Sequence, residues 1–559
     1  MDALAFEHHL VSPQGAGHVP DGAVTATAGG GACCDEITFS VALDAGRVRD
    51  AGFEARGCGS AHAAGSAAVE LVRGAPVLAA ARIGAGEIAA ELGGLSPGKL
   101  HAAELAADAL ARALGAAVRR GGADGRPAAD PGPGATLVAM SGGVDSAVAA
   151  HLCARGGVDA GKVCPPEADK SSPRCGVAAG GGGAGKVCPP EADKSSPHDG
   201  VAAGGGGAGK VCPPEADKGS PHDGERTPVI AVTLELWADH ENDAERSCCS
   251  ASAVAQARAL AHSMGLAHFT LDLRDEFRAG VVEPFIAGYA AGETPNPCVG
   301  CNGHVRLDAM LAFADRLGCE WLATGHYARV SESDHPGGPL LRAAADPAKD
   351  QTYMLAALEP SSLRRMRFPL GELTKPRVRE IAAAAGLPVA AKADSQDLCF
   401  LAGTDRARFL ARHGGIGDEP GEIVDAAGRV LGTHAGQHRF TVGQRRGLGE
   451  LSIHAREPLF VLHKDAASRR VTVGPRAALQ TDRVRIRGAR LRRDGARVDR
   501  VKLRYRSRPL PARVLGEPAA GPHRTLELAL DEPADGAAPG QLACLMDGES
   551  VVGWGTIAR

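Results

Sequence analysis

Two cysteine motifs in this 559-residue chain could carry sulfur or metal chemistry. Residues 294–302 read TPNPCVGCN, a loop stiffened by two prolines that holds Cys298 and Cys301 in a CxxC spacing. Residues 394–400 read DSQDLCF and contain Cys399. The chain has 15 cysteines but no signal peptide and no long apolar run, so we expect a cytoplasmic protein whose thiols stay reduced. In that setting clustered cysteines favour metal or sulfur chemistry over disulfides.

A third motif, SGGVDS at 141–146, lies between a predicted strand and a predicted helix. Its glycines let the backbone approach a ligand, its N–H groups and the helix start form an anion nest, and Ser141 and Ser146 add hydroxyl donors. The motif lacks the GK[ST] of a Walker A loop. It is identified as the signature of the PP-loop superfamily, which splits ATP to AMP to adenylate an oxygen. The resemblance implies an ATP site, with Mg²⁺, at Ala139, Met140, Ser141, Gly142, Gly143, Val144, Asp145 and Ser146.

Alternating strands and helices must position these motifs. We predict buried strands at 135–140, 228–236, 267–273 and 319–327, with a helix after each of the first two, the second capped by Ser250 or Ser252. This alternation predicts an α/β fold with a parallel sheet and helices on both faces. From about Pro420, short alternating strands with glycine turns predict one or two small β domains.

A repeat with a period of 24 residues interrupts the α/β region. The phrase GKVCPPEADK begins at Gly161, Gly185 and Gly209, and glycine runs join the copies. Such a segment has too few apolar residues to offset the entropy of ordering. We therefore interpret 157–227 as a disordered, low-complexity insertion, whose widely spaced cysteines do not form a chelate pattern.

The remaining motifs resemble those of the tRNA-specific 2-thiouridylases, the MnmA family. TPNPCVGCN is similar to the family's TPNPDxxCN, and SQDLCF is similar to its SQxxCF. The likeness continues in order through ATGHYARV, KDQTYML, FPLGELTKPRVREIA, GQHRFTVGQRRGLG, LRYRSRP and APGQ, and it covers about 134–559 apart from the insertion. It implies a tRNA-uridine 2-sulfurtransferase that adenylates the C2 oxygen of the wobble uridine and then delivers sulfur, giving 2-thiouridine.

The resemblance implies that Cys399 carries a persulfide, supplied by a cysteine desulfurase or a sulfur-relay protein. Cys301 is then the nucleophile that releases sulfide or forms a transient disulfide with Cys399. Cys298 departs from the commoner pattern, which has an Asp that contacts the target base. Cys298, Cys301 and Cys399 also offer three thiolates for a four-iron–four-sulfur cluster with one iron open for sulfide. Zinc is disfavoured because neither motif shows a fourth ligand. Persulfide and cluster chemistry both stay open at this point.

The resemblance further implies an adenine and ribose pocket at Leu234 and Gly325. It implies tRNA contacts at Asn296, Pro297, Cys298, His326, Lys349, Asp350, Gln351, Arg504, Tyr505 and Gln541. The formal net charge of −4 does not by itself favour a polyanion partner, but residues 481–513 hold 13 Lys and Arg against 3 Asp. That excess suits an RNA backbone, while a solvated strand face is the alternative. For His326 the alternative is a packing role beside a strand end.

The N-terminal region forms a separate unit with further metal-ligand chemistry. ACCD at 32–35 and RGCGSA at 56–61 resemble elements of IscU/NifU-type iron–sulfur scaffolds, and KLHA at 99–102 resembles their KxHC, with Ala102 in place of the third cysteine. The resemblance implies an α+β scaffold domain whose candidate ligands for zinc, iron or a cluster are Cys33, Asp35, Cys58 and His101. A docking module without metal is the alternative.

The expected organisation is therefore a scaffold-like domain at 1–118, a linker at 119–133 and a PP-loop domain at 134–345. A helical segment with the second catalytic cysteine follows at 346–415, then a small β domain at 416–480 and a β-barrel-like tRNA-binding domain at 481–559. Two other function classes compete. A PP-loop ligase of another class has no need of CxxC and SQxxCF, and a non-enzymatic iron–sulfur scaffold or carrier has no need of SGGVDS.

Overall fold

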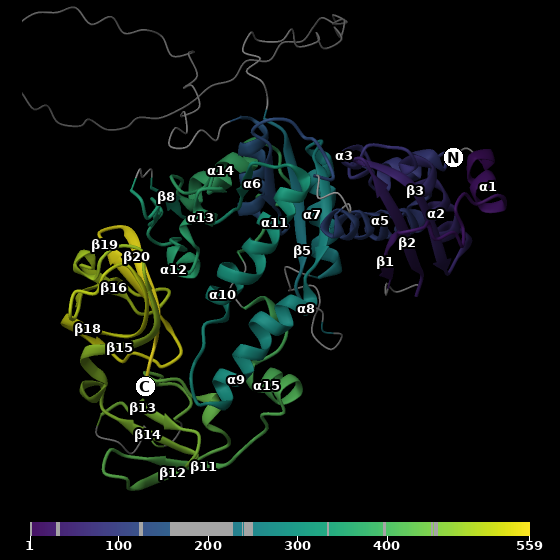
Figure 1. Ribbon diagram of the computed structural model, residues 1–559. Coiled ribbons are helices and arrows are strands. Elements are labelled where there is room, and N and C mark those ends of the chain that lie inside the picture. Colours follow the sequence, from purple (N-terminus) through teal and green to yellow (C-terminus); the bar gives the residue numbers. More distant parts are fainter. Residues whose placement is uncertain are drawn as a thin grey trace, which may run out of the picture. The chain divides into compact units, whose positions relative to one another are not determined.

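The computed structural model describes residues 3–29, 34–121, 127–156, 227–237, 239, 250–331, 335–394, 398–448, 451 and 457–559. The predicted insertion therefore lies outside the described residues, apart from Thr227. All the described residues belong to one compact unit, and Figure 1 shows its elements in chain order.

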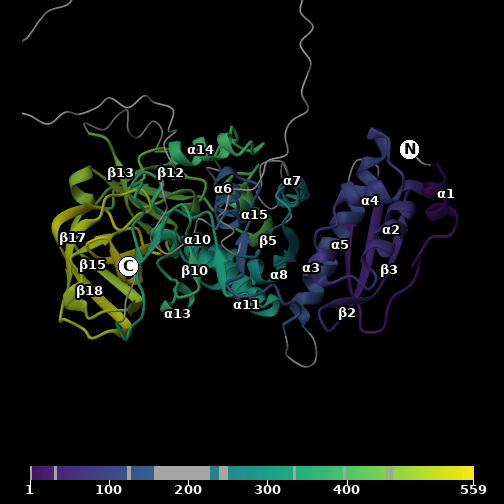
Figure 2. The same ribbon diagram turned by 90° about the horizontal axis from the view of Figure 1, so that it is seen from above.

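The N-terminal region is α+β, as predicted. Its antiparallel sheet has the order β1-β2-β3, with β1 at Val24–Gly29, β2 at Glu36–Asp44 and β3 at Arg47–Arg56. Helices α2 (Gly59–Val72) and α5 (Leu100–Arg120) pack against this sheet and each other (Figure 2). Helix α5 extends two residues beyond the predicted domain end at 118, and its apolar face includes the buried Ala117 and Val118. The other helices are α1 (Ala3–Val11), α3 (Val77–Ala80) and α4 (Ala85–Glu91).

A five-stranded parallel sheet forms the centre of the α/β region. Its order is β10-β7-β4-β5-β6. The strands are β4 (Thr136–Ala139), β5 (Val229–Glu235), β6 (Ala267–Asp272), β7 (Trp321–Ala323) and β10 (Met366–Arg367). Strand β7 is shorter than the predicted 319–327, since it begins at Trp321 and ends at Ala323. The predicted parallel sheet is thus confirmed.

Both faces of this sheet are covered, which explains its apolar strands. Alternate residues of β4 point to opposite faces: Leu137 packs in one buried cluster with α11 (Leu307–Leu317), and Val138 packs in another with α6 (Val144–Ala154). Helices α7 (Ala251–Ser263) and α14 (Lys375–Ala384) lie on the α6 side. Ser250 caps α7 by accepting a hydrogen bond from the Ala253 N–H, as the sequence predicts.

The strand order changes direction at β4. Strands β5 and β6 follow on one side of β4, and β7 and β10 lie on the other. In open α/β sheets, ligands bind beyond the carboxyl ends of strands at such a switch point. The SGGVDS motif begins directly after β4, so the topology places it at the expected binding position.

The cysteine motifs lie on short helical segments that follow the sheet. A continuous helical stretch comprises α8 (Arg274–Phe277), a π-helical turn (Arg278–Val282) and α9 (Glu283–Ala290). The CxxC spans α10 (Pro297–Gly300) and a second π-helical turn (Cys301–Arg306), which leads into α11. Cys399 begins a 3₁₀ turn (Cys399–Leu401), followed by α15 (Arg406–Gly414). The remaining helices of this part are α12 (Thr352–Leu355) and α13 (Pro360–Leu363).

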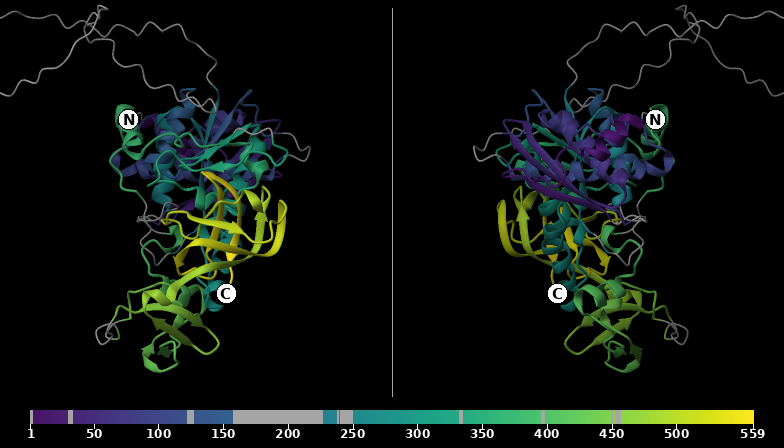
Figure 3. Two further views of the ribbon diagram at one scale, coloured as in Figure 1. Left: turned by 90° about the vertical axis from the view of Figure 1, so that its left-hand side faces the viewer. Right: turned by 90° about the vertical axis from the view of Figure 1, so that its right-hand side faces the viewer.

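The C-terminal part consists of two β structures. A four-stranded sheet has the order β12-β11-β14-β13, formed by β11 (Gly421–Val424), β12 (Val430–His434), β13 (Phe460–Asp465) and β14 (Arg470–Gly474). The second, seen from two sides in Figure 3, closes into a barrel because β15 pairs with both β18 and β20. Its strands are β15 (Gln480–Leu491), β16 (Arg500–Lys502), β17 (Leu510–Val514), β18 (Gly521–Asp535), β19 (Leu542–Asp547) and β20 (Ser550–Ile557).

Two strands from the α/β region join this second structure. Strand β9 (Leu341–Arg342) pairs with β20, and β8 (Arg329–Val330) pairs with β9. Among the described residues, every helix is too short or too polar to cross a lipid bilayer.

Candidate functional site

The SGGVDS loop has the geometry of an anion cradle. Gly142 has a φ of +67°, a backbone conformation that glycine adopts without strain, and Gly143 is the N-cap of α6. The Ser146 hydroxyl accepts a hydrogen bond from the Ser141 N–H at 3.1 Å and donates one to the Gly143 carbonyl at 3.1 Å. Ser146 therefore holds the loop in shape, whereas the sequence suggested a donor to the ligand.

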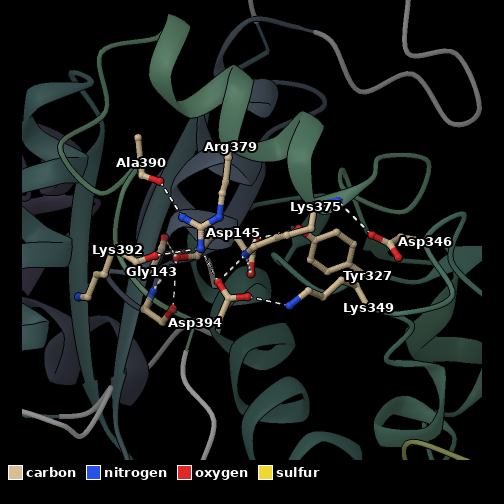
Figure 4. Close-up of polar contacts among 12 residues, drawn as sticks. Gly143, Asp145, Tyr327, Asp346, Lys349, Lys375, Arg379, Ala390, Lys392 and Asp394 are labelled. Atoms are coloured by element: carbon tan, nitrogen blue, oxygen red, sulfur yellow. Dashed lines mark hydrogen bonds and ion pairs between the residues drawn. The ribbon is translucent and has the colours of Figure 1, made fainter.

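Asp145 joins the loop to a network of charged side chains (Figure 4). Its carboxylate accepts hydrogen bonds from the Lys375 ammonium at 2.7 and 2.8 Å and from the Tyr327 hydroxyl at 2.8 Å. Lys375 also lies 2.8 Å from a carboxylate oxygen of Asp394. One buried lysine thus links the nucleotide loop to the segment that leads to Cys399.

Asp394 forms ion pairs with three basic side chains. Lys349 lies 2.7 Å from it and Arg379 3.1 Å, in addition to Lys375. Burial works to raise the pKa of Asp394, but hydrogen bonds from Lys349 and Lys375 outweigh it and lower the pKa to about 2. Asp394 is therefore ionised at neutral pH and serves as a fixed anchor.

The adenine and ribose positions implied by the sequence flank the same loop. Leu234 is buried near the end of β5, the strand beside β4. Gly325 lies after β7 and against the start of α6, where an added Cβ would stand 2.7 Å from the Ser146 nitrogen. Gly325 is thus in contact with the loop backbone itself.

The CxxC loop is held by local hydrogen bonds. The Asn296 side chain caps α10 by accepting a hydrogen bond from the Cys298 N–H at 3.2 Å, and Pro297 occupies the first helical position. Cys301 is 6% exposed and begins the π-helical turn, a distortion that occurs often at functional sites. Cys298 is half-buried.

Residues of the C-terminal barrel form hydrogen bonds with the residues just before and at the start of this loop. Arg487 of β15 donates two hydrogen bonds to the Glu293 carboxylate, at 2.7 and 2.8 Å. The Gln541 side-chain amide donates to the Thr294 carbonyl at 2.6 Å, and the Thr294 N–H donates to the Pro539 carbonyl at 2.8 Å. Gln541, a predicted tRNA contact, therefore positions the CxxC loop in this structure.

The Cys399 segment is anchored on both sides. Before it stands Asp394 with its cations. After it, the ring of Phe400 packs in a buried aromatic cluster with Phe277, Phe285 and Phe409, at centroid distances of 5.0 to 5.8 Å. Residues 395–397 of the motif lie outside the described residues. Cys399 is half-buried.

Several other side chains predicted to contact tRNA form hydrogen bonds with other residues of the chain. The Asp350 carboxylate accepts hydrogen bonds from Lys502 and Thr352, and the Gln351 side chain accepts one from the Tyr327 N–H. His326 is hydrogen-bonded to Thr324 at 2.8 Å, and burial together with Arg306 lowers the pKa of His326 to about 3. Its ring is therefore neutral near pH 7.

The basic segment 481–513 carries less available positive charge than its composition suggests. Six of its guanidinium groups pair with carboxylates, three of which lie on β18. Arg504 donates to the Asp535 and Gly536 carbonyls, and Tyr505 is half-buried. The composition of the segment could not reveal five of these pairs, because their carboxylates come from other parts of the chain.

The N-terminal candidate ligands converge. Ligand atoms of Asp35, Cys58 and His101 all lie within 4.8 Å of one another. The Cys58 thiol is 3.2 Å from Asp35, and the His101 Nε2 is 3.4 Å from the same carboxylate oxygen. Gly57, at a φ of +140°, faces Asp35 so closely that a Cβ would overlap its carboxylate. Cys33 lies outside the described residues.

Sequence reasoning missed Lys375, Arg379, Lys392 and Asp394 as site residues. Lys375 and Arg379 lie in the motif FPLGELTKPRVREIA, which was noted for its likeness but given no role. Lys392 donates a hydrogen bond to the Gly142 carbonyl at 2.9 Å. These residues lie more than 200 positions after the SGGVDS loop. No motif spacing near the loop could therefore identify them.

Four protein families match this sequence. They are the NifU-like N terminal domain at 5–122, the tRNA methyl transferase HUP domain at 222–403, the tRNA methyl transferase PRC-barrel domain at 407–475 and the Aminomethyltransferase beta-barrel domain at 488–557. Their order agrees with the succession of α+β, α/β and β structures described above.

Curated relatives extend this match to the whole chain. The Bifunctional protein NifU/MnmA of Rubrobacter xylanophilus is 40% identical over 561 residues, covering 99% of this chain and 97% of that protein. The tRNA-specific 2-thiouridylase MnmA of Methylorubrum extorquens is 43% identical over 344 residues, 59% of this chain and 87% of that protein. The corresponding protein of Zymomonas mobilis is 42% identical over 332 residues, 59% of this chain and 86% of that protein.

Proposed function

The chain belongs to the bifunctional NifU/MnmA family and is a tRNA 2-thiouridylase, and from this premise we propose how its two chemical steps are divided among its residues. The observation that carries the proposal is the contact of Lys375 with both Asp145 and Asp394. It brings the nucleotide loop and the segment of Cys399 to one place. Adenylation and sulfur transfer can then act on the same uridine in turn.

ATP activates the uridine in the first step. The C2 oxygen attacks the α-phosphorus, the bond from that phosphorus to the bridging oxygen breaks, and pyrophosphate leaves with the electron pair. The uridine releases its N3 proton. The N–H groups of Gly142 and Gly143 at the start of α6 receive the phosphate oxygens. Mg²⁺ prefers oxygen ligands, and Asp145 is the carboxylate that the loop offers beside the phosphates of the substrate.

Sulfur replaces the activated oxygen in the second step. The terminal sulfur of a Cys399 persulfide, supplied by an external donor protein, attacks C2, loses its proton and expels AMP. The Cys301 thiolate then attacks the Cys399 sulfur, which forms a Cys301–Cys399 disulfide and releases the 2-thiouridine. A thiol reductant restores both cysteines. Alternatively, Cys301 attacks the persulfide first and releases sulfide, which adds to C2.

Cys298 supports a second route for sulfur delivery. Cys298, Cys301 and Cys399 would hold three irons of a four-iron–four-sulfur cluster, and the chemistry of this donor set fits such a group. A bound cluster would supply an open iron for sulfide. Among the described residues, the three thiols do not all lie within 4.8 Å of one another. This separation argues against a single zinc ion at these cysteines. Iron and acid-labile sulfide in the anaerobically purified protein, lost in Cys298→Ala, would favour the cluster route.

The N-terminal domain is proposed to hold a metal ion or cluster. The His101 Nδ1 lies 3.0 Å from the Gly98 carbonyl, which can only accept, so Nδ1 carries the proton. The other ring nitrogen, Nε2, faces the Asp35 carboxylate at 3.4 Å, an arrangement that suits a shared cation. Asp35, Cys58 and His101, with Cys33, would hold it. Loss of bound metal in His101→Ala, with unchanged AMP formation, is the expected result.

The target base must be unstacked, because its C2 oxygen is inaccessible in a duplex. We propose that Lys349, His326 and Tyr505, which are partly exposed, contact the tRNA directly. We assign Asp350, Gln351 and Gln541 to positioning the surrounding loops, and Asn296 and Pro297 to shaping the CxxC turn. Arg504 is exposed, and we propose that it contacts the tRNA as well.

The proposed function is tested with the full chain, tRNA, ATP and a persulfide donor. Cys399→Ser should abolish 2-thiouridine formation while ATP binding is unchanged. Cys34→Ser, which alters an exposed cysteine of the N-terminal domain, is the matched control and should behave as wild type. Thiolation by Cys399→Ser at the wild-type rate would remove Cys399 from the mechanism.

A further inference from the structure

The nucleotide loop contains no cation of its own. Its residues are serines, glycines, a valine and Asp145, and the aspartate adds negative charge where a polyphosphate must bind. Release of pyrophosphate concentrates further negative charge on the leaving oxygen. Enzymes that cleave phosphoanhydrides place fixed positive charge at that point. A basic residue from elsewhere in the chain can add positive charge here beside Mg²⁺.

Lys375 is the cation whose position meets this need. It is the first residue of α14 and only 8% exposed, and its ammonium lies within 2.8 Å of both oxygens of Asp145 (Figure 4). Its backbone N–H donates to Asp346 at 3.0 Å, which fixes the start of the helix. A lysine buried at this depth is uncommon unless it is paired, and Lys375 has two carboxylate partners.

The neighbouring cations do not pair with the carboxylate of the loop. Lys392 contacts the Gly142 carbonyl and the Gln256 side chain, both neutral acceptors. Arg379 donates to the Ala390 and Lys392 carbonyls as well as to Asp394. Lys349 pairs with Asp394. Among the described ion pairs, Lys375 is the one that reaches a side chain of the loop.

We propose that Lys375 is a catalytic residue that binds the pyrophosphate part of ATP and stabilises it as the leaving group. This inference rests on the proposed function, because it assumes that ATP occupies the SGGVDS loop. As the bond from the α-phosphorus breaks, the electron pair moves to the bridging oxygen, to which the ammonium donates a hydrogen bond. In a Walker A loop, a lysine of the loop itself contacts the β- and γ-phosphates; here Lys375 of α14 has that role.

Asp394 competes with the phosphate for the same ammonium. Without nucleotide, Asp394 shares Lys375 with Asp145; with nucleotide, the phosphate oxygens replace part of that contact. This predicts opposite effects for two substitutions. Removal of the lysine weakens pyrophosphate binding, whereas removal of the Asp394 charge strengthens it.

The experiment measures binding of inorganic pyrophosphate and of AMP to the full chain by calorimetry. Lys375→Gln should weaken pyrophosphate binding by about 10- to 100-fold, the range for loss of a charge-assisted hydrogen bond, and leave AMP binding unchanged. Lys375→Arg should retain most of the affinity. Arg377→Gln is the matched control, since Arg377 lies on the same helix but pairs with Glu380 at 2.9 Å.

Asp394→Asn keeps the inference testable if Lys375→Gln folds poorly. It should bind pyrophosphate more tightly than wild type. Equal weakening of pyrophosphate and AMP binding in Lys375→Gln, or weaker pyrophosphate binding in Asp394→Asn, would assign Lys375 a structural role and overturn the inference. Failure of the wild-type protein to bind either AMP or ATP would instead refute the nucleotide site, and the inference with it.

Discussion

The substitution Gly325→Ala tests the packing that shapes the nucleotide loop. A Cβ at Gly325 would stand 2.7 Å from the Ser146 nitrogen, 2.8 Å from the Asp145 carbonyl carbon and 3.0 Å from the Ser146 Cα. All three are backbone atoms, so no side chain can rotate away. Because ordinary contacts to carbon begin near about 3.5 Å, the first turn of α6 must shift by about 0.7 Å.

That shift has a calculable consequence. Overpacking of this kind costs about 1–3 kcal/mol of folding free energy. A displacement close to 1 Å at a site of reaction costs about 100-fold in rate. We therefore expect Gly325→Ala to fold but to form AMP about 100-fold more slowly than wild type, because the N–H groups that receive the phosphates move.

The assay compares tRNA-dependent AMP formation and thermal unfolding in two variants. Gly417→Ala is the control, since a Cβ there meets no atom within 4 Å. It should match wild type in both measurements. Formation of AMP by Gly325→Ala at the wild-type rate would refute the close packing of Gly325 against α6.

Two further predictions concern the contacts that hold the CxxC loop and its surroundings. Arg487→Gln should slow 2-thiouridine formation and cost about 1 kcal/mol of stability, because the bidentate pair with Glu293 is strong but its arginine is half exposed. Unchanged thiolation, measured by nucleoside analysis against the neighbouring Arg485→Gln, would show that the pair does not position the loop. Lys464 is 4% exposed, and burial, helped by Arg406 and Arg559, lowers the pKa of Lys464 to about 7. Between about pH 7 and its unfolded value near 10.5 the unfolded chain binds the extra proton, so stability rises with pH across this window. Lys464→Met should therefore be more stable than wild type at pH 6, with a gap in melting temperature that narrows toward pH 10; a gap independent of pH would contradict the shifted pKa.

The sequence predicted the parts of the fold that depend on local pattern. The strands around 136–139 and 229–235, the Ser250 cap and the glycine loop all follow from short-range periodicity and residue type. The parallel sheet follows from their alternation. The three cysteines of the two motifs were recognised because the surrounding motifs resemble those of one family and occur in the same order.

Contacts between distant segments could not be predicted in this way. Lys375 meets Asp145 across 230 positions of sequence, and nothing near either residue signals the other. The strands β8 and β9 join the C-terminal β structure because their partner β20 lies there, not because of their own composition. The positive charge of 481–513 looked available because most of the carboxylates that pair with it lie outside that segment.

The most direct test of the central claim follows the oxygen that leaves the uridine. A tRNA whose target uridine carries ¹⁸O at C2 is incubated with the full chain, ATP and a persulfide donor, and the products are analysed by mass spectrometry. Activation by adenylation predicts one ¹⁸O in the phosphate of AMP for each 2-thiouridine formed. Label in water with unlabelled AMP, or formation of ADP in place of AMP, would contradict the account.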